Sequence, residues 1–357
     1  MSMANTLPSE PGFLSRLFKG NFSWAQRGLD LVGMGWLIHL AKLITGHNRA
    51  EQLDALKQKL LIPLLGISIF VAGWAVLAPQ VKTSLGVIPG PVQVWEQVGK
   101  VAEDHRLEKS KAAAFYERQE ARNQKLIADG KSDKVKVRQY TGKPTFLNQI
   151  LTSLVTVALG FIIATVVAVP LGLACGLSKN VQGAINPLIQ IFKPVSPLAW
   201  LPIVTMVVSA MYVNPSDWLP KSMLISAITV TLCSLWPTLV NTTVGVASVD
   251  KDLINVSRVL KLSTGQSILK VVLPSALPLM FTGLRLSLGV GWMVLIAAEM
   301  LAQNPGLGKF VWDEFQNGSS DSLAKIMMAV LVIGIIGFIL DRIMYSLQQA
   351  FTLRASS

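Results

Sequence analysis

The chain has 357 residues, 51% of them hydrophobic, and a formal net charge of +12. Its mean hydropathy is +0.50, and several apolar runs approach 20 residues, the length that crosses a bilayer as a helix. This pattern excludes a soluble protein and predicts an all-α polytopic membrane protein. We find no residue cluster typical of a catalytic or metal site. We also expect no nucleic-acid partner, because a positive net charge is common in membrane proteins for topological reasons alone.

The N-terminal part is predicted to be cytoplasmic up to residue 59. Residues 1–27 contain no long apolar run, which argues against a cleaved signal peptide. Residues 28–46 are apolar on one side but include Asp30, His39 and Lys42, a pattern that favours an interfacial helix over a span. Residues 60–79 are predicted to contain the first transmembrane helix, at 60–77.

Residues 80–147 form a long polar insert, which we place on the extracytoplasmic side by alternating the spans from a cytoplasmic N-terminus. The composition of residues 109–126 predicts an exposed helix or hairpin there.

Residues 148–347 are predicted to form the core membrane domain, followed by a cytoplasmic tail at 348–357. Its five spans are expected at 150–173, 187–212, 223–246, 278–301 and 323–347, which gives six transmembrane helices in all. The alternation places the polar loop 247–274 in the cytoplasm, and the short loops agree with the excess of Lys and Arg expected on that side.

The span at 187–212 contains four prolines, at 187, 194, 197 and 202, with Lys193, Ser196 and Trp200 between or beside them. Each interior proline removes a helical hydrogen bond, so we expect irregular backbone. Such backbone at membrane depth often borders a transport pathway. The alternative is a kinked helix that only packs against its neighbours.

In the span at 278–301, Arg285, Trp292 and Glu299 share one helical face, because they lie seven residues apart. Charged side chains in a membrane usually face a bundle interior or an aqueous route, so this face is predicted to line the pathway. Arg285 could attract a small oxyanion, or else extend to the inner headgroups. Glu299 is expected to pair with a neighbour, and Trp292 to pack or to act as a steric gate.

The loop between residues 250 and 274 has the pattern of a short amphipathic helix, predicted at 250–264. Asp250 suits a helix N-terminus, and Leu253, Val256 and Leu260 recur at helical spacing. We expect Leu273 and Pro274 to end this segment and Pro278 to open the next span. The apolar face could dock on a soluble partner, although an ordinary connecting loop remains an alternative.

This loop resembles the "EAA" loop of the membrane subunits of ATP-binding-cassette (ABC) importers, which forms a coupling helix in a groove of the cytoplasmic ATPase. Asn255, Val256 and Ser257 stand at the triplet, Lys261 at the glycine position, and Leu273–Pro274 at the close. The coupling contact would then involve Asp250, Leu253, Asn255, Val256, Ser257, Arg258, Leu260 and Lys261.

The runs at 192–204, 234–242, 256–263, 273–301 and 304–308 look like the permeases of nitrate, bicarbonate, taurine and alkanesulfonate importers, and most like the nitrate permeases. The resemblance implies the type I ABC importer permease fold, a location in the bacterial inner membrane, and no catalysis by this chain. It implies alternating access with a second copy of the chain, two ATPase subunits that bind ATP and Mg, and an extracytoplasmic solute-binding protein.

The cargo implied is a small oxyanion, with nitrate or nitrite ahead of bicarbonate, sulfonate or taurine. A secondary anion transporter is the alternative from another class. Under the importer hypothesis, the insert at 80–147 is either a docking site for the solute-binding protein or a solvated spacer.

Overall fold

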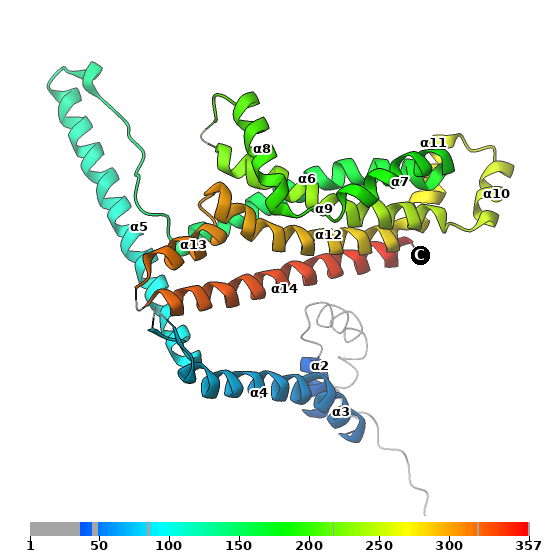
Figure 1. The fold of residues 1–357 in the computed structure, drawn as a ribbon, viewed down its shortest axis with the longest axis horizontal. Helices are drawn as coiled ribbons and strands as arrows, with labels where there is room; N and C mark the ends of the chain where they lie inside the picture. Colours follow the sequence, from blue (N-terminus) through cyan, green and yellow to red (C-terminus); the bar gives the residue numbers. More distant parts are fainter. Residues whose placement is uncertain (1–35, 45–48, 84–85, 217, 320, 356–357) are drawn as a thin grey trace, which may run out of the picture.

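The computed structural model describes residues 36–44, 49–83, 86–216, 218–319 and 321–355, and these are almost entirely helical (Figure 1). Five helical stretches are long and apolar enough to cross a membrane: Ala50–Gln80, Phe146–Leu177, Lys221–Ala247, Thr264–Ala302 and Ser322–Phe351. A bent helix pair could supply a sixth span. The predicted all-α polytopic class is therefore confirmed.

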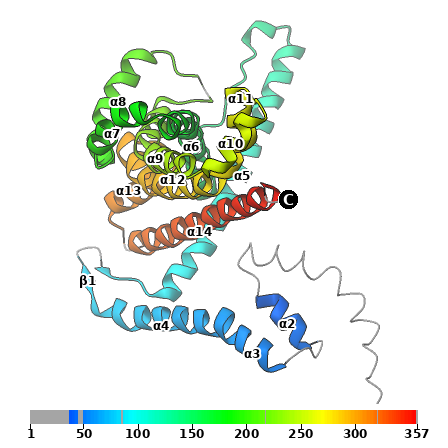
Figure 2. The same ribbon diagram turned by 90° about the vertical axis from the view of Figure 1, so that its right-hand side faces the viewer.

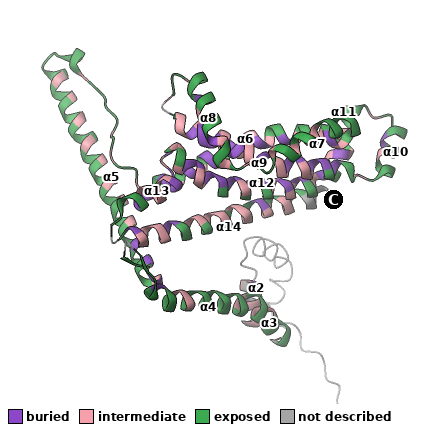
Figure 3. Cartoon of the chain, in the orientation of Figure 1, coloured by how far each residue is buried: buried purple, intermediate pink, exposed green. Residues whose placement is uncertain are grey.

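The centre of the core is α9 (Lys221–Ala247), which lies between α6 (Phe146–Leu177) and α12 (Leu273–Ala302). Figure 3 shows that the buried residues concentrate on these three helices. The last helix, α14 (Ser322–Ala355), packs along α12.

Helices α6 and α9 approach closely because α6 presents small residues. A Cβ atom on Gly160 would lie 2.7 Å from the Ala227 carbonyl oxygen, and one on Gly172 would lie 2.8 Å from that of Leu239. Thr231 on α9 donates a hydrogen bond to the Gly160 carbonyl at 3.0 Å. Small residues and interhelical hydrogen bonds are typical of helix packing in membranes.

The predicted start of the fifth span is wrong. A π-helical turn, η4 (Ile268–Val272), runs directly into α12 at Leu273. Pro274 lies in the first turn of α12, directly after the π-helical turn, and Pro278 lies inside the helix. The inner loop therefore consists only of α10 (Lys251–Val259), α11 (Thr264–Ser267) and their connections.

The predicted span at 187–212 is not one continuous helix, because two helices meet there at a sharp bend and could together form one broken span. Helix α7 (Lys179–Phe192) and helix α8 (Pro197–Met211) are bent by 103° about residues 193–196. Pro194 and Pro197 lack amide hydrogens, and the Ser196 side chain caps α8. The irregular backbone expected from the prolines is thus confirmed. We call residues 193–196 the proline bend.

The N-terminal part lies apart from the core. Helices α2 (Trp36–Ile44) and α3 (Arg49–Leu56) and the π-helical η1 (Lys57–Leu61) lead into α4 (Ile62–Leu77). None of the residues of α4 is buried, and Figures 1 and 2 show it separated from α9 and α12. The predicted first span exists, whereas most of the predicted interfacial helix, outside residues 36–44, lies outside the described residues.

The insert holds a much longer helix than predicted. After the short η2 (Ala78–Gln80) and the antiparallel strands β1 (Lys82–Thr83) and β2 (Gly86–Val87), α5 (Pro91–Ala128) extends for 38 residues. Pro91 occupies the first helical position, and the Gly90 amide donates to the Gln93 side chain at 2.5 Å. These signals start the helix early.

The chain returns from α5 through η3 (Ser132–Lys134) to α6. A further helix that we did not predict, α13 (Leu307–Asn317), lies between α12 and α14 at the same end of the molecule. We call this the outer end, following the predicted topology, and the end that carries α10 the inner end.

Candidate functional site

The inner loop presents an exposed apolar face on α10. The Asp250 carboxylate caps the helix by accepting a hydrogen bond from the Asp252 amide at 2.9 Å. Val259 and Leu260 are 80% and 65% exposed, and Leu253 and Val256 are exposed beside them. A short helix that leaves so much apolar surface in solvent has the character of an interaction site.

Seven of the eight predicted coupling residues are exposed, whereas Ser257 points into the loop. Ser257 is 3% exposed. Its hydroxyl donates to the Ile254 carbonyl at 2.7 Å and lies 3.0 Å from the Ser267 hydroxyl. Ser257 therefore joins α10 to α11 instead of facing outward.

Lys261 ends α10 in the left-handed conformation, with a φ of 51°. Only glycine adopts this conformation without steric cost, because it lacks a Cβ atom. The glycine of the loop that this segment resembles would stand at the same position. The backbone of the loop thus agrees with the register of the resemblance.

The proline bend exposes Lys193 and Ser196. Phe192, just before the bend, lies between two tryptophans: its ring centroid is 5.7 Å from that of Trp200 and 6.4 Å from that of Trp236 on α9. The three rings therefore connect the two arms of the bend to the core.

The indole N–H groups of Trp200 and Trp236 are buried and have no hydrogen-bond partner among the described residues. A buried donor without a partner costs about 1–3 kcal/mol, so such groups usually find an acceptor in some state of the protein. Sequence reasoning missed Trp236, although it stands beside Pro237, a further proline inside a helix.

Arg285 does not stand free on its helix face, because it forms an ion pair with Asp341 of α14. Its Nε and Nη2 donate to the two carboxylate oxygens, the latter bond measuring 2.7 Å, and its guanidinium lies 5.3 Å from the centre of the Tyr345 ring. This pair replaces the predicted alternatives of a lone anion-attracting charge or a side chain extended to the headgroups. Asp341 was missed, although an acidic residue within the last predicted span was a signal.

Trp292 packs between α12 and α14. Its side chain is buried, and its indole N–H donates to the Ile333 carbonyl at 3.0 Å. This agrees with the expectation that Trp292 packs.

Glu299 is fully buried at the outer end of α12. Its two carboxylate oxygens accept from the Ser153 hydroxyl of α6 at 2.9 and 2.8 Å, from the Asn304 amide at 3.3 Å, and from the Gly308 backbone N–H at 3.0 Å. The Ser153 hydroxyl also accepts from the Leu307 N–H at 2.9 Å. Among the described residues no Lys or Arg pairs with Glu299, so neutral donors hold this carboxylate.

These contacts join α6, α12 and α13 at one point, which we call the Glu299 cradle: Ser153, Glu299, Asn304, Leu307 and Gly308. A Cβ atom on Gly306 would lie 2.1 Å from a Glu299 carboxylate oxygen, so the turn between α12 and α13 needs glycine there. The face that carries Arg285, Trp292 and Glu299 is thus occupied by contacts within the chain.

Comparisons with known proteins agree with this arrangement. The model of the family "Binding-protein-dependent transport system inner membrane component" matches residues 168–353. The nitrate import permease protein NrtB of Synechocystis sp. is 39% identical over 56% of this chain and 68% of its own length. The bicarbonate transport system permease protein CmpB of Synechococcus elongatus is 32% identical over 85% of this chain and 94% of its own.

Among solved structures, a chain of the inward-facing MetNI methionine ABC transporter superposes with a TM-score of 0.50 at 14% identity, covering 58% of this chain and 96% of that one. At this identity the similarity concerns the fold alone. The chain therefore belongs to the family of binding-protein-dependent transport system inner membrane components, the non-catalytic permease subunits of ABC importers, in which separate subunits bind ATP.

Proposed function

We propose that this chain is the permease subunit of an ATP-driven importer of a small oxyanion, with nitrate or nitrite as the preferred cargo. The observation that carries the proposal is the 39% identity, over 201 residues, to a protein named as a nitrate import permease. The same family membership leaves no room for a secondary transporter, which would work without ATPases.

The exposed apolar face of α10 supports a docking role for the inner loop. Leu253, Val256, Val259 and Leu260 would enter a groove of the ATPase, with Arg258 and Lys261 at its rim. Asp250 caps this helix, Asn255 is exposed on it, and Ser257 joins it to α11. Closure of an ATPase pair would then move α10 and α11 together.

We assign the transport route to the proline bend instead of the Arg285 face. Lys193 and Ser196 are exposed there, and the indole N–H groups of Trp200 and Trp236 are buried donors with no acceptor in the described part of the chain. An oxyanion passing the bend would meet a cation and hydrogen-bond donors, which suit its charge. In this mechanism the bend opens alternately to the two sides, and no residue performs covalent chemistry.

The proposed assembly contains a second copy of the chain, two ATPase subunits and a solute-binding protein. Helix α4 has no buried residue, so its apolar side chains are available to lipid or to a second copy of the chain. The dependence on a binding protein and on ATPases follows from the family.

Bicarbonate is the second candidate cargo, because the bicarbonate permease matches over nearly its whole length. The taurine transport permease TauC of Escherichia coli, 32% identical over 58% of this chain, keeps a sulfonate as a third candidate.

Uptake of labelled nitrate and bicarbonate, measured side by side in proteoliposomes that contain the permease, its co-expressed ATPases and the binding protein, tests the proposal. We expect ATP-dependent uptake of nitrate. ATP-dependent uptake of bicarbonate alone would change the cargo, and uptake of either anion that persists without ATP would refute the coupling.

The docking role of α10 has a separate test. Replacing Leu260 by Asp should abolish co-purification of the ATPase, whereas Lys251→Gln on the same helix should not. Unchanged co-purification of the Leu260 variant would contradict the assignment.

A further inference from the structure

Helix α5 and the chain that returns from it form a stiff arm at the outer end. The returning residues are fastened to the helix by side-chain contacts: the Arg138 N–H donates to the Gln119 side chain at 2.7 Å, and the Tyr140 hydroxyl donates to Glu108 at 2.7 Å. Figure 1 shows α5 extending away from the core. A solvated spacer would not need these contacts.

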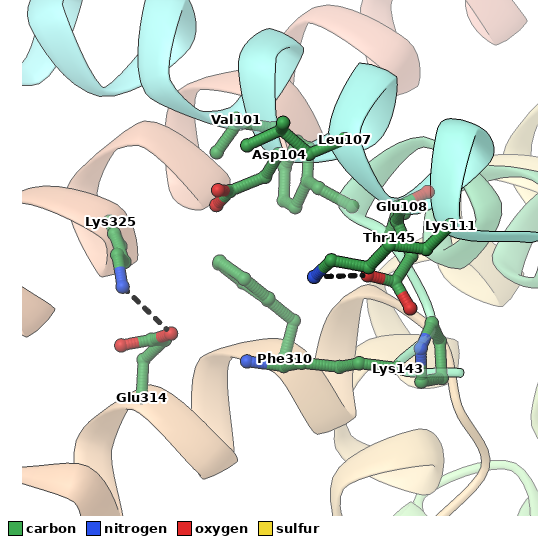
Figure 4. A pocket seen from close by; sticks show the side chains of 12 residues that line it. Val101, Asp104, Leu107, Glu108, Lys111, Lys143, Thr145, Phe310, Glu314 and Lys325 are labelled. Atoms are coloured by element: carbon green, nitrogen blue, oxygen red, sulfur yellow. Dashed lines mark hydrogen bonds and ion pairs between the residues drawn. The ribbon is translucent and has the colours of Figure 1, made fainter.

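A cavity of about 260 Å³ lies where the arm joins the core. Its walls come from α5, the segment before α6, α13 and α14, and Phe310 of α13 projects into it (Figure 4). The Phe310 ring packs edge-on against Phe146 of α6, with centroids 4.8 Å apart. We call this space the arm-root cavity.

Charged side chains of both signs surround the arm-root cavity, and two of them are unpaired. Lys111 pairs with Glu108 at 3.3 Å, and Lys325 pairs with Glu314 at 3.4 Å. The Lys143 ammonium and the Asp104 carboxylate have no ion-pair or hydrogen-bond partner among the described residues, and Figure 4 shows them on opposite sides of Phe310. A ligand that matches this cavity would therefore offer one acidic and one basic group.

The cavity is mechanically connected to the membrane core through α13. Glu314 on α13 is buried, and it accepts from the Ser322 hydroxyl at 3.0 Å. At its other end α13 begins at Leu307, whose N–H belongs to the Glu299 cradle. A body that pushes on Phe310 would thus act on α12, the helix that continues to the inner loop.

We propose that the arm-root cavity is a docking site for the solute-binding protein, which inserts a surface projection carrying one acidic and one basic side chain. The acid pairs with Lys143 and the base with Asp104, and the projection rests on Phe310. This inference depends on the proposed importer function, because the family requires a binding protein and the cavity opens at the predicted extracytoplasmic end.

Charge reversal in the intact transporter tests the site. Lys143→Glu and Asp104→Lys are introduced separately, with Lys136→Glu and Glu103→Lys as matched controls, since these two residues are exposed on the arm outside the cavity. The permease with its ATPases is placed in lipid nanodiscs. The dissociation constant of the purified binding protein and its stimulation of ATP hydrolysis are then measured.

We expect each cavity variant to weaken binding about tenfold and to reduce the stimulation, while basal ATP hydrolysis stays unchanged. The control variants should bind as the native protein does. If the cavity variants bind the solute-binding protein normally, the proposal is overturned. It is also overturned if they change only the association of two permease copies and leave the affinity for the solute-binding protein unchanged.

If the native permease did not co-purify with the ATPases, or if it showed no ATP-dependent transport, the importer function itself would be refuted. The two failures are therefore distinguishable.

Discussion

Replacement of Glu299 is the sharpest test of the buried contacts at the outer end. Glu299→Ala removes the acceptor of three buried donors: the Ser153 hydroxyl, the Asn304 amide and the Gly308 N–H. Each donor left without a partner costs about 1–3 kcal/mol. Because water can enter the space that the side chain vacates, we take the lower end and expect a loss of about 3 kcal/mol.

Glu299→Gln separates the effect of lost hydrogen bonds from the effect of lost side-chain volume, because Gln and Glu have nearly the same size. The amide oxygen still accepts one hydrogen bond, but its NH₂ group meets another donor, so we expect an intermediate loss of about 1–2 kcal/mol. An exposed carboxylate of α5, Glu96, provides the control, and Glu96→Ala should change stability by less than about 0.5 kcal/mol.

The assay is unfolding in mixed micelles titrated with SDS, combined with limited proteolysis of the turn at residues 303–306. The expected order of stability is native, then Gln, then Ala, and cleavage should accelerate in the same order. Native-like stability of both Glu299 variants would show that the cradle does not hold α13, and would also remove the mechanical step proposed for the arm-root cavity.

Three further predictions follow from local geometry. Lys261→Gly should stabilise the inner loop by about 1 kcal/mol, measured as slower hydrogen exchange in α10, because it relieves the left-handed backbone. Gly172→Leu should prevent assembly of the core, seen as loss of folded protein in detergent, because even its Cβ would lie 2.8 Å from the Leu239 carbonyl. The hydrogen bond from Tyr140 lowers the pKa of Glu108, so the ionised carboxylate stabilises the arm above its unfolded pKa and the contribution fades as the pH falls through the folded pKa. The protection of residues 135–145, measured as hydrogen exchange relative to the intrinsic rate at each pH, should therefore fall below about pH 4, whereas in Glu108→Gln it should stay constant in that range.

The spans could be predicted from the sequence because hydropathy and helical length are local properties. The proline bend was also visible locally, since Pro194 and Pro197 remove backbone donors wherever the chain folds. The direction and size of the bend were not, because they depend on the packing of Phe192 between Trp200 and Trp236, which come from separate helices.

The residues that pair with the charged side chains in the spans could not be predicted from the sequence. Helical spacing correctly put Arg285 and Glu299 on one face, but it cannot say which element covers that face. Asp341 lies 56 positions after Arg285, and Ser153 lies 146 positions before Glu299. A charge in a predicted span indicates that a partner exists, and only the tertiary structure identifies it.

The contacts of α12 determine where the core can bend. Near its middle, Arg285 holds it to α14, and the Ser287 hydroxyl lies 2.7 Å from that of Thr238 on α9. At its outer end the Glu299 cradle holds it to α6 and α13. Polar contacts of α12 therefore reach α6, α9, α13 and α14, and we expect these helices to move as one body when α10 and α11 are displaced. The two arms of the proline bend meet at 103° and contact each other through the rings of Phe192 and Trp200, so we expect the change of access to be concentrated at residues 193–196.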